Sequence, residues 1–517
     1  MASKAEKGNK SLKASAFYLV GNLFNKALAF FTIPIFTRLL TTSEYGISQT
    51  YLSWVSILTL IVGMSLGNSI RTAYIDFGDD IEGYMSSIYG LSLLSFVGSS
   101  ALIITGMLIW SDIDIVLVIC CLMQSYFQFV STAMTTKYMM KVDYIKKTLL
   151  LALPNLTIQV AAIITILNMH GDNKYMGYII PYAAVYTIVG IYFVIASFIR
   201  GKKVFNKLYW KYALTYSLPL IFHGLSLVLL SSSDRIMITN LYNSSETGVY
   251  SLIYNLSMVA MAVTASLEAV WVPWFTRKLM TNEKDIINKN ITKYLEIALV
   301  VMLCLMFVAP EIVKIMATKE YYSGIYMIPP LVFASFEMYM YTVYVNVEYY
   351  YKSTKHIAFN TIVAAVTNIV LNFIFVPMFG GMAACFTTVA SYMVSFIMHS
   401  RHSRKLDKDL FPIRQFALPT IIFIVAIVLA YLLMDLWLVR WIIVVAGFGC
   451  YAVFALVTKR FAHHNRQMLL RSCVPLNVRF QAVHLKMPCL QGTAHCALRH
   501  ASPCLRYMIQ PDHSGSS

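Results

Sequence analysis

Charged side chains are scarce in this sequence. They make up 13% of its 517 residues, whereas 58% of the residues are hydrophobic. A soluble protein carries roughly 25% charged residues, so this chain has too few of them to cover a water-facing surface. The apolar residues instead form long runs, and a helix needs about 20 such residues to cross a bilayer. The composition therefore predicts an all-α, polytopic membrane protein.

Several motifs of catalysis and ligand binding are also missing. The chain has no Walker loop for ATP, which argues against a built-in motor. Its last 46 residues hold four cysteines without a C-x-x-C pair, so a zinc site there is not favoured. The acidic run DFGDD at 76–80 fits a solvated loop better than a metal-binding transferase site. The outward loops are short, unlike those of a polymerase or ligase. We expect a protein that is not an enzyme and has no metal or cofactor.

The apolar runs predict fourteen membrane spans, the first of which is too long for a cleavable signal peptide. The predicted spans are residues 14–36, 46–66, 87–110, 113–134, 148–169, 176–199, 212–233, 249–272, 292–313, 325–350, 357–376, 382–399, 415–435 and 438–458. The expected domains are a six-helix bundle at 1–205, a second at 206–400, a helix pair at 401–460 and a tail at 461–517. We expect the tail to be disordered. Its abrupt change of composition suggests a frameshifted or otherwise unselected terminus.

The basic residues predict the orientation of these spans. With the N-terminus placed in the cytoplasm, and with Lys293 and Arg440 at span ends counted with the adjoining segments, 30 of the 41 Lys and Arg residues lie in cytoplasmic segments and 6 in outward loops. This asymmetry follows the positive-inside rule and puts both termini in the cytoplasm. The net charge of +17 is therefore read as an orientation signal. Because the basic residues are scattered over many short segments, nucleic-acid binding is not expected.

A short polar loop occurs twice in the sequence. Residues 37–46 read TRLLTTSEYG and residues 239–248 read TNLYNSSETG, with five identities at a constant offset of 202. Six spans separate the copies, so both lie on the outward side and indicate a parallel repeat. Chance similarity between short loops is the alternative. Two facing bundles enclose a cleft that rocking exposes to each side in turn, so the repeat favours a transporter.

We interpret the repeated loop as structural first and as a substrate contact second. Ser or Thr followed by Glu44 or Glu246 suits a helix N-terminus, where a hydroxyl caps free N–H groups and a carboxylate complements the dipole. Gly46 and Gly248 are interpreted as residues that tolerate a backbone conformation other residues resist.

The sequence around both copies resembles a known family. The runs FTIPIFTRLLTTSEYGISQTY at 31–51 and SSDRIMITNLYNSSETGVYSLIYN at 232–255 resemble the polysaccharide and O-antigen flippases of the multidrug/oligosaccharidyl-lipid/polysaccharide exporter superfamily. The resemblance covers most of residues 12–460. It implies movement of an undecaprenyl-diphosphate-linked oligosaccharide across the bacterial inner membrane for O-antigen, capsule or exopolysaccharide assembly. The implied partners are this lipid-linked substrate, membrane lipids and assembly proteins such as a polysaccharide polymerase.

An anionic lipid substrate calls for positive charge in the cleft. Lys26 lies near the middle of span 1, with Asn22 one turn earlier, and a lysine there costs about 2.5 kcal/mol or more if it faces lipid. We therefore expect both residues to line a cavity and bind substrate, the alternative being a lysine paired with a buried carboxylate. His223, central in span 7, is either a second phosphate donor, a protonation switch, or a neutral hydrogen-bonded residue.

Other candidates lie at the span ends and inside spans 8 and 10. Arginines at the mouths of the cleft could receive phosphate, although snorkelling to the interface is the common alternative. Carboxylates inside spans could couple transport to H⁺ or Na⁺, or could simply pair with a cation. Tyrosines could stack on a sugar or sit at the interface. These candidates are Arg38, Arg71 and Arg235 for phosphate, Glu268 and Glu337 for ion coupling, and Tyr341 and Tyr344 for sugar.

Two other functions stay open at the level of sequence. A multidrug and toxin exporter of the same superfamily would need an acidic cleft, built around Glu268 and Glu337, instead of a cationic one. A membrane glycosyltransferase or polymerase would show sugar transfer by the purified protein. The sugar and the driving force, which could be H⁺, Na⁺ or the membrane potential, are not readable from the residues.

Overall fold

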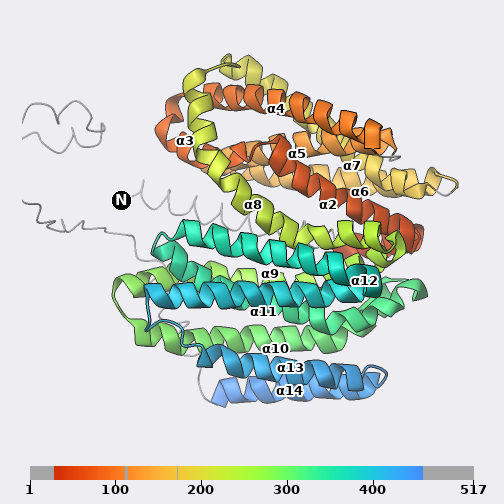
Figure 1. Ribbon diagram of the computed structural model, residues 1–517, viewed down its shortest axis with the longest axis vertical. Helices are drawn as coiled ribbons and strands as arrows, with labels where there is room; N and C mark the ends of the chain where they lie inside the picture. The colour runs from red at the N-terminus through yellow and green to blue at the C-terminus, as the bar shows by residue number, and fades with distance from the viewer. Residues whose placement is uncertain (1–27, 29, 111–113, 172, 458–517) are drawn as a thin grey trace, which may run out of the picture. The chain divides into compact units, whose positions relative to one another are not determined.

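The computed structural model describes residues 28, 30–110, 114–171 and 173–457, and within them the chain is helical without a β-strand (Figure 1). The long helices are Phe30–Leu39, α2 (Thr42–Val62), α4 (Ile81–Trp110), α5 (Ile115–Met140), α6 (Tyr144–Asn168), α7 (Lys174–Gly201), α8 (Lys207–Leu241), α9 (Ser244–Met280), α10 (Lys284–Met316), α11 (Ile328–Tyr350), α12 (Thr354–Leu406), α13 (Arg414–Leu432) and α14 (Trp437–Val457). Short connecting helices are η1 (Leu66–Ser69), α3 (Ile70–Asp76), η2 (Gly78–Asp80) and η3 (Lys319–Met327).

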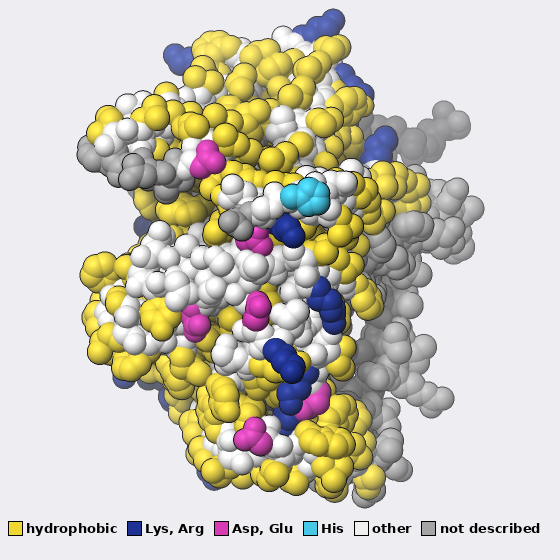
Figure 2. Space-filling model, turned by 90° about the vertical axis from the view of Figure 1, so that its right-hand side faces the viewer, with side chains coloured by type: hydrophobic (Ala, Val, Ile, Leu, Met, Phe, Trp, Pro, Cys, Tyr) yellow, Lys and Arg dark blue, Asp and Glu magenta, His cyan; other side chains and the backbone are white. Residues whose placement is uncertain are grey.

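These helices confirm the prediction of a polytopic membrane protein. Ten of the described helices are long and apolar enough to cross a bilayer. Large apolar side chains point outward from them, such as Leu102 of α4 and Ile188 of α7, which are 78% and 68% exposed. Exposed apolar side chains along the helices are stable against lipid and not against water. Figure 2 shows the face that lies to the right in Figure 1, where the helices end, and there hydrophobic side chains surround a central area of other side chains and backbone that includes charged residues.

A single residue divides the longest helix into two spans. α12 runs for 53 residues, but Gly380 inside it has φ of +58° and ψ of −139°. An L-residue with a side chain rarely adopts this region, so glycine allows the chain to turn back at this point. The two parts, 354–379 and 381–406, correspond to the eleventh and twelfth predicted spans.

α8 belongs to both halves of the sequence. At its beginning, Tyr209 and Ala213 are buried in the same apolar core as Tyr84 of α4. At its other end, Asp234 contacts Asn372 of α12. The helix therefore begins against the first six spans and ends among the last, with Pro219 between the two regions.

The acidic run 76–80 is part of this attachment and is not a free loop. The Tyr212 hydroxyl of α8 donates to Asp76 at 2.6 Å, and the Tyr209 hydroxyl donates to Asp80 at 2.5 Å. Lys203, just after α7, pairs with Asp80 at 2.6 Å. Asp76 is exposed and Asp80 partly exposed, as the prediction of a solvated segment requires, but tyrosines far along the chain also bind both carboxylates.

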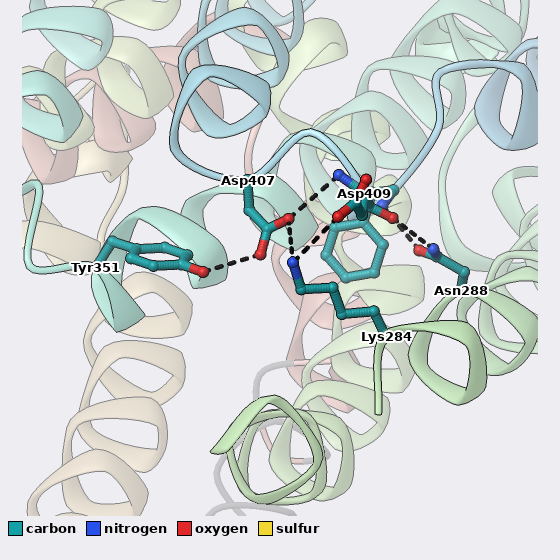
Figure 3. Close-up of polar contacts among 6 residues, drawn as sticks. Lys284, Asn288, Tyr351, Asp407 and Asp409 are labelled. Carbon is teal, nitrogen blue, oxygen red and sulfur yellow. Dashed lines mark hydrogen bonds and ion pairs between the residues drawn. The ribbon is translucent and has the colours of Figure 1, made fainter. Parts of the chain in front are cut away.

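A polar cluster joins the loop after α12 to α10 and α11 (Figure 3). The Lys284 ammonium lies 2.9 Å from a carboxylate oxygen of Asp407, and the Tyr351 hydroxyl donates to the other oxygen at 2.9 Å. Asn288 donates to the carbonyl of Asp409 at 2.7 Å. Burial would raise the pKa of Asp407, but the hydrogen bonds from Lys284 and Tyr351 outweigh it and hold this pKa below its ordinary value.

The expected domain boundaries stay predictions. Among the described residues, contacts hold the chain up to Cys450 in one compact unit and assign the residues from Tyr451 on to another. The boundary expected at 205/206 falls in the link between α7 and α8, whereas that at 400/401 falls inside α12, which continues to Leu406. The expected tail at 461–517 lies outside the described residues.

Candidate functional site

The two copies of the repeated loop meet face to face. Ser43 and Ser244 share a hydrogen bond of 2.7 Å, and Thr42 and Ser245 share one of 2.9 Å. Shifting the first pair by the offset of 202 gives the second pair, so the two copies make equivalent contacts with each other. Such a reciprocal contact is typical of a two-fold relation between two similar surfaces.

Two glycines allow the helices after these loops to approach. A Cβ on Gly46 of α2 would lie 1.8 Å from the Ser244 carbonyl oxygen, and one on Gly248 of α9 would lie 2.0 Å from that of Thr42. Both glycines lie inside regular helices. The sequence interpretation, conformational freedom, is therefore wrong: these glycines are needed for close contact between backbones.

The two glutamates of the loops hold helix N-termini within their own halves. The Glu44 carboxylate accepts from the Thr41 backbone N–H at 2.9 Å and from that of Lys174, the first residue of α7, at 2.9 Å. The Glu246 carboxylate accepts from the Gly381 N–H at 3.3 Å, where the second part of α12 begins. In the described part of the chain, these contacts of both glutamates support the structural interpretation.

Asp234 is a buried carboxylate that was not among the candidates from sequence. Asp234 of α8 is 1% exposed and accepts hydrogen bonds from Tyr250 of α9 at 2.6 Å, and from Asn372 and Thr388 of the two parts of α12 at 2.6 and 2.8 Å. Asn368 accepts from Asn372 at 3.2 Å. The predicted span ended at residue 233, so Asp234 was assigned to a loop, whereas α8 continues to Leu241.

The two glutamates predicted for ion coupling lie apart from this cluster. Glu337 of α11 is fully buried, and neither of its carboxylate oxygens has a hydrogen-bond partner among the described residues. Glu268 of α9 is of intermediate exposure. Ion coupling through either stays a prediction.

The cationic candidates are not gathered in one place. Arg38 donates to the carbonyl of Ile315 at 2.8 Å near the end of α10, and Arg71 is exposed on α3. Arg235 donates to Asn255 at 3.2 Å and lies over the Tyr254 ring at 4.5 Å. These contacts give Arg38 and Arg235 structural roles and leave phosphate binding untested. Lys26 and Asn22, the central pair of the predicted site, lie outside the described residues.

The two candidate tyrosines are packed in the second half. Tyr344 is fully buried, and its hydroxyl donates to the carbonyl of Phe411 at 3.1 Å. Tyr341 stacks on His399 with ring centroids 5.7 Å apart. His223, on α8, is partly exposed. Contact of any of these with a substrate stays a prediction.

The family of this chain follows from comparison with known proteins. Residues 11–279 match the model of the family described as "Polysaccharide biosynthesis protein", and residues 275–411 match that described as "Putative exopolysaccharide Exporter (EPS-E)". The first match spans more than half of the chain. The chain belongs to the polysaccharide biosynthesis protein family, and the resemblance to polysaccharide flippases is confirmed at this level.

Individual relatives are distant. The chain is 22% identical to "Lsg locus putative protein 1" of Haemophilus influenzae over 359 residues, 68% of this chain and 87% of that protein. Among solved structures it is similar to "Lipid II flippase MurJ, inward closed conformation", with a TM-score of 0.65, 14% identity, and coverage of 85% of this chain and 99% of that one. This likeness shows that the two chains share a fold.

Proposed function

We propose that this protein flips an undecaprenyl-diphosphate-linked oligosaccharide from the inner to the outer leaflet of the bacterial inner membrane. The family and the fold support a transporter for polysaccharide biosynthesis. The observation that carries the proposal is the reciprocal contact of the two loops, Ser43 with Ser244 and Thr42 with Ser245.

This contact is suited to opening and closing. Its side chains are hydroxyls, which water can satisfy when the halves separate. The close approach at Gly46 and Gly248 excludes other groups when the halves are together. We infer that the structure is closed at the end of the helices predicted to face outward, and that separation of the two loops opens that end.

The cationic cleft remains part of the proposal. Lys26, with Asn22, would bind the diphosphate, and both termini would face the cytoplasm, where the lipid-linked unit is made. After flipping, the unit would pass to assembly proteins such as a polymerase.

Asp234 is the residue we assign to ion coupling, and it takes precedence over Glu268 and Glu337. Its carboxylate joins α8, α9 and both parts of α12, so gain or loss of a cation there would change the packing of four segments. The cluster offers one carboxylate, amide oxygens and hydroxyls, which are hard oxygen ligands that suit H⁺ or Na⁺.

A deletion strain tests the function. Loss of surface polysaccharide with build-up of the lipid-linked unit on the inner leaflet is expected, reversed by the wild type and not by Lys26→Ala. Rescue by Lys26→Ala would keep the flippase and remove the role of the lysine. Normal polysaccharide without build-up would overturn the proposal and favour the drug exporter, for which efflux of amphipathic cations by Glu268 and Glu337 variants is the next measurement.

A further inference from the structure

A second buried acidic group in the second half is paired with histidine. Glu348 of α11 and His399 of α12 are both fully buried, and Nδ1 of the imidazole lies 2.8 Å from the Glu348 Oε2 atom. The Oε1 atom of Glu348 and the Nε2 atom of His399 have no hydrogen-bond partner among the described residues. Asn360 lies 3.4 Å from Nδ1. The pair thus shares one hydrogen bond and keeps two polar atoms unused.

The pair ends a matched row of polar and aromatic side chains on two neighbouring helices. Each row follows steps of four, three and four residues, the spacing of one helix face. The rows are Glu337, Tyr341, Tyr344 and Glu348 on α11, and Thr388, Tyr392, Ser395 and His399 on α12. Tyr341 touches the other row twice, with ring centroids 5.9 Å from Tyr392 and 5.7 Å from His399. The rows therefore face each other.

At the cytoplasmic end, the pair continues to the surface. His402 lies one helical turn beyond His399, and its Nε2 atom is 2.8 Å from the Ser353 hydroxyl. The same hydroxyl lies 3.1 Å from Nδ1 of His356, whose ring stacks on His402 at 3.9 Å. His356 is exposed, and the backbone N–H of Ser353 donates to the Glu348 carbonyl at 2.9 Å, so this group lies between the buried pair and water.

At the other end, the row reaches the Asp234 cluster. Thr388 donates to Asp234 at 2.8 Å. Beside it, a cavity of about 10 Å³ is lined by Tyr254, Ser257, Tyr392 and their neighbours. This volume holds about one water molecule, and the hydroxyl groups around it are suitable partners.

We propose that Glu348 and His399 form a proton-binding site that exchanges protons with the cytoplasm through His402 and Ser353. A carboxylate with a neutral imidazole carries one negative charge. Uptake of one proton, delivered from water at Ser353, makes the pair neutral overall, and its release returns the proton by the same path. The proposal does not depend on which substrate is moved.

Other titratable groups face this pair from each neighbouring element. His223 of α8 lies within electrostatic range of His399, and Glu268 of α9 within range of Tyr341. Tyr349 of α11 and His402 of α12 lie within range of Glu348. Each of these groups could gain or lose a proton over the same pH range. The test must therefore detect the carboxyl group of Glu348 itself.

Infrared difference spectroscopy of the purified full-length protein in lipid provides this resolution. Spectra are compared at pH values on either side of about 6.5, the ordinary pKa of histidine. The test variant is Glu348→Gln with His399→Gln, whose amides keep a hydrogen bond without a titrating group. The matched control is His170→Gln, since His170 is exposed in the loop between α6 and α7.

We expect a carboxyl band that changes with pH in the wild type and in the control, and that is lost in the double variant. An unchanged carboxyl band in the double variant, or no pH-dependent carboxyl band in the wild type, would overturn the proposal. If the double variant fails to fold, Glu348→Gln alone decides by the same carboxyl band. His402→Ala should slow the change of the carboxyl band after a pH jump several-fold. An unaltered rate of this change would overturn the path through His402. Failure of the flippase assay leaves these readouts unaffected.

Discussion

Gly46 of α2 and Gly248 of α9 lie against each other where the two copies of the repeated loop meet. The Cβ position of Gly46 is 2.8 Å from the backbone nitrogen of Gly248, and that of Gly248 is 3.2 Å from the nitrogen of Gly46. The two residues are equivalent in the internal repeat, so the repeat forms its own contact surface.

Alanine at either glycine should force the helices apart. Gly46→Ala or Gly248→Ala should lower stability by about 1–3 kcal/mol through overpacking against backbone, and should reduce transport. Thermal unfolding in detergent and polysaccharide rescue in the deletion strain measure these effects. Gly98→Ala is the control, because no atom lies within 4 Å of a Cβ there. Equal behaviour of all three variants would show that the close approach is not required.

A disulfide across the repeat contact should stop the cycle. Ser43 and Ser244 have hydroxyl oxygens 2.7 Å apart, so cysteines at both positions can bridge after small adjustments. Oxidation of Ser43→Cys with Ser244→Cys, in a background without other cysteines, should abolish flipping, and reduction should restore it. Each single cysteine variant serves as control. Full transport by the cross-linked protein would refute opening at this end.

Removal of the Asp234 charge should uncouple transport from its ion. Asp234→Asn keeps the size of the side chain but replaces one acceptor oxygen, so one of the donors from Tyr250, Thr388 or Asn372 loses its partner. We expect flipping in proteoliposomes that no longer responds to a proton or sodium gradient. Glu268→Gln is the comparison at the site predicted from sequence. If flipping by Asp234→Asn still depends on the ion gradient and flipping by Glu268→Gln does not, ion coupling belongs to Glu268 instead of Asp234.

The Asp407 cluster should make stability depend on acid pH. Since the pKa of Asp407 is below its ordinary value of about 4, the stabilisation is complete above that value and is lost as the pH falls through the folded-state pKa. Asp407→Asn should cost roughly 1–3 kcal/mol at neutral pH and have little effect in acid.

Thermal unfolding at both pH values measures this difference. Asp409→Asn is the control, because the Asp409 side chain is 76% exposed although it lies 3.3 Å from Lys284, and exposed pairs contribute about 0–1 kcal/mol. An equal loss for both variants, or a loss that persists in acid, would contradict the assignment to Asp407.

Sequence reasoning was strongest where the signal is local. Thirteen of the fourteen predicted spans coincide with described helices or with a part of α12. Span length depends on a continuous apolar run, which needs no knowledge of neighbours. Gly380 lies between two predicted spans, and its positive φ explains how they join without a loop.

Local patterns failed at helix ends. The predicted span 7 ends at residue 233, one residue before Asp234, so the burial of Asp234 in α8 is missed. The charge is tolerated there because Tyr250, Asn372 and Thr388 supply hydrogen bonds. Buried polar groups need such partners, and none of these three lies within one turn of Asp234 in the sequence.

The helical class of the protein, its apolar spans and its repeated loop can be predicted from the residues alone, because hydrophobic runs and internal identity are properties of short segments. The contact between the copies of the loop, the role of their glycines in that contact, and the pairing of Glu348 with His399 across 51 residues become visible only in the folded chain. Those relations depend on which helices pack together, and packing is set by the shapes of many side chains at once.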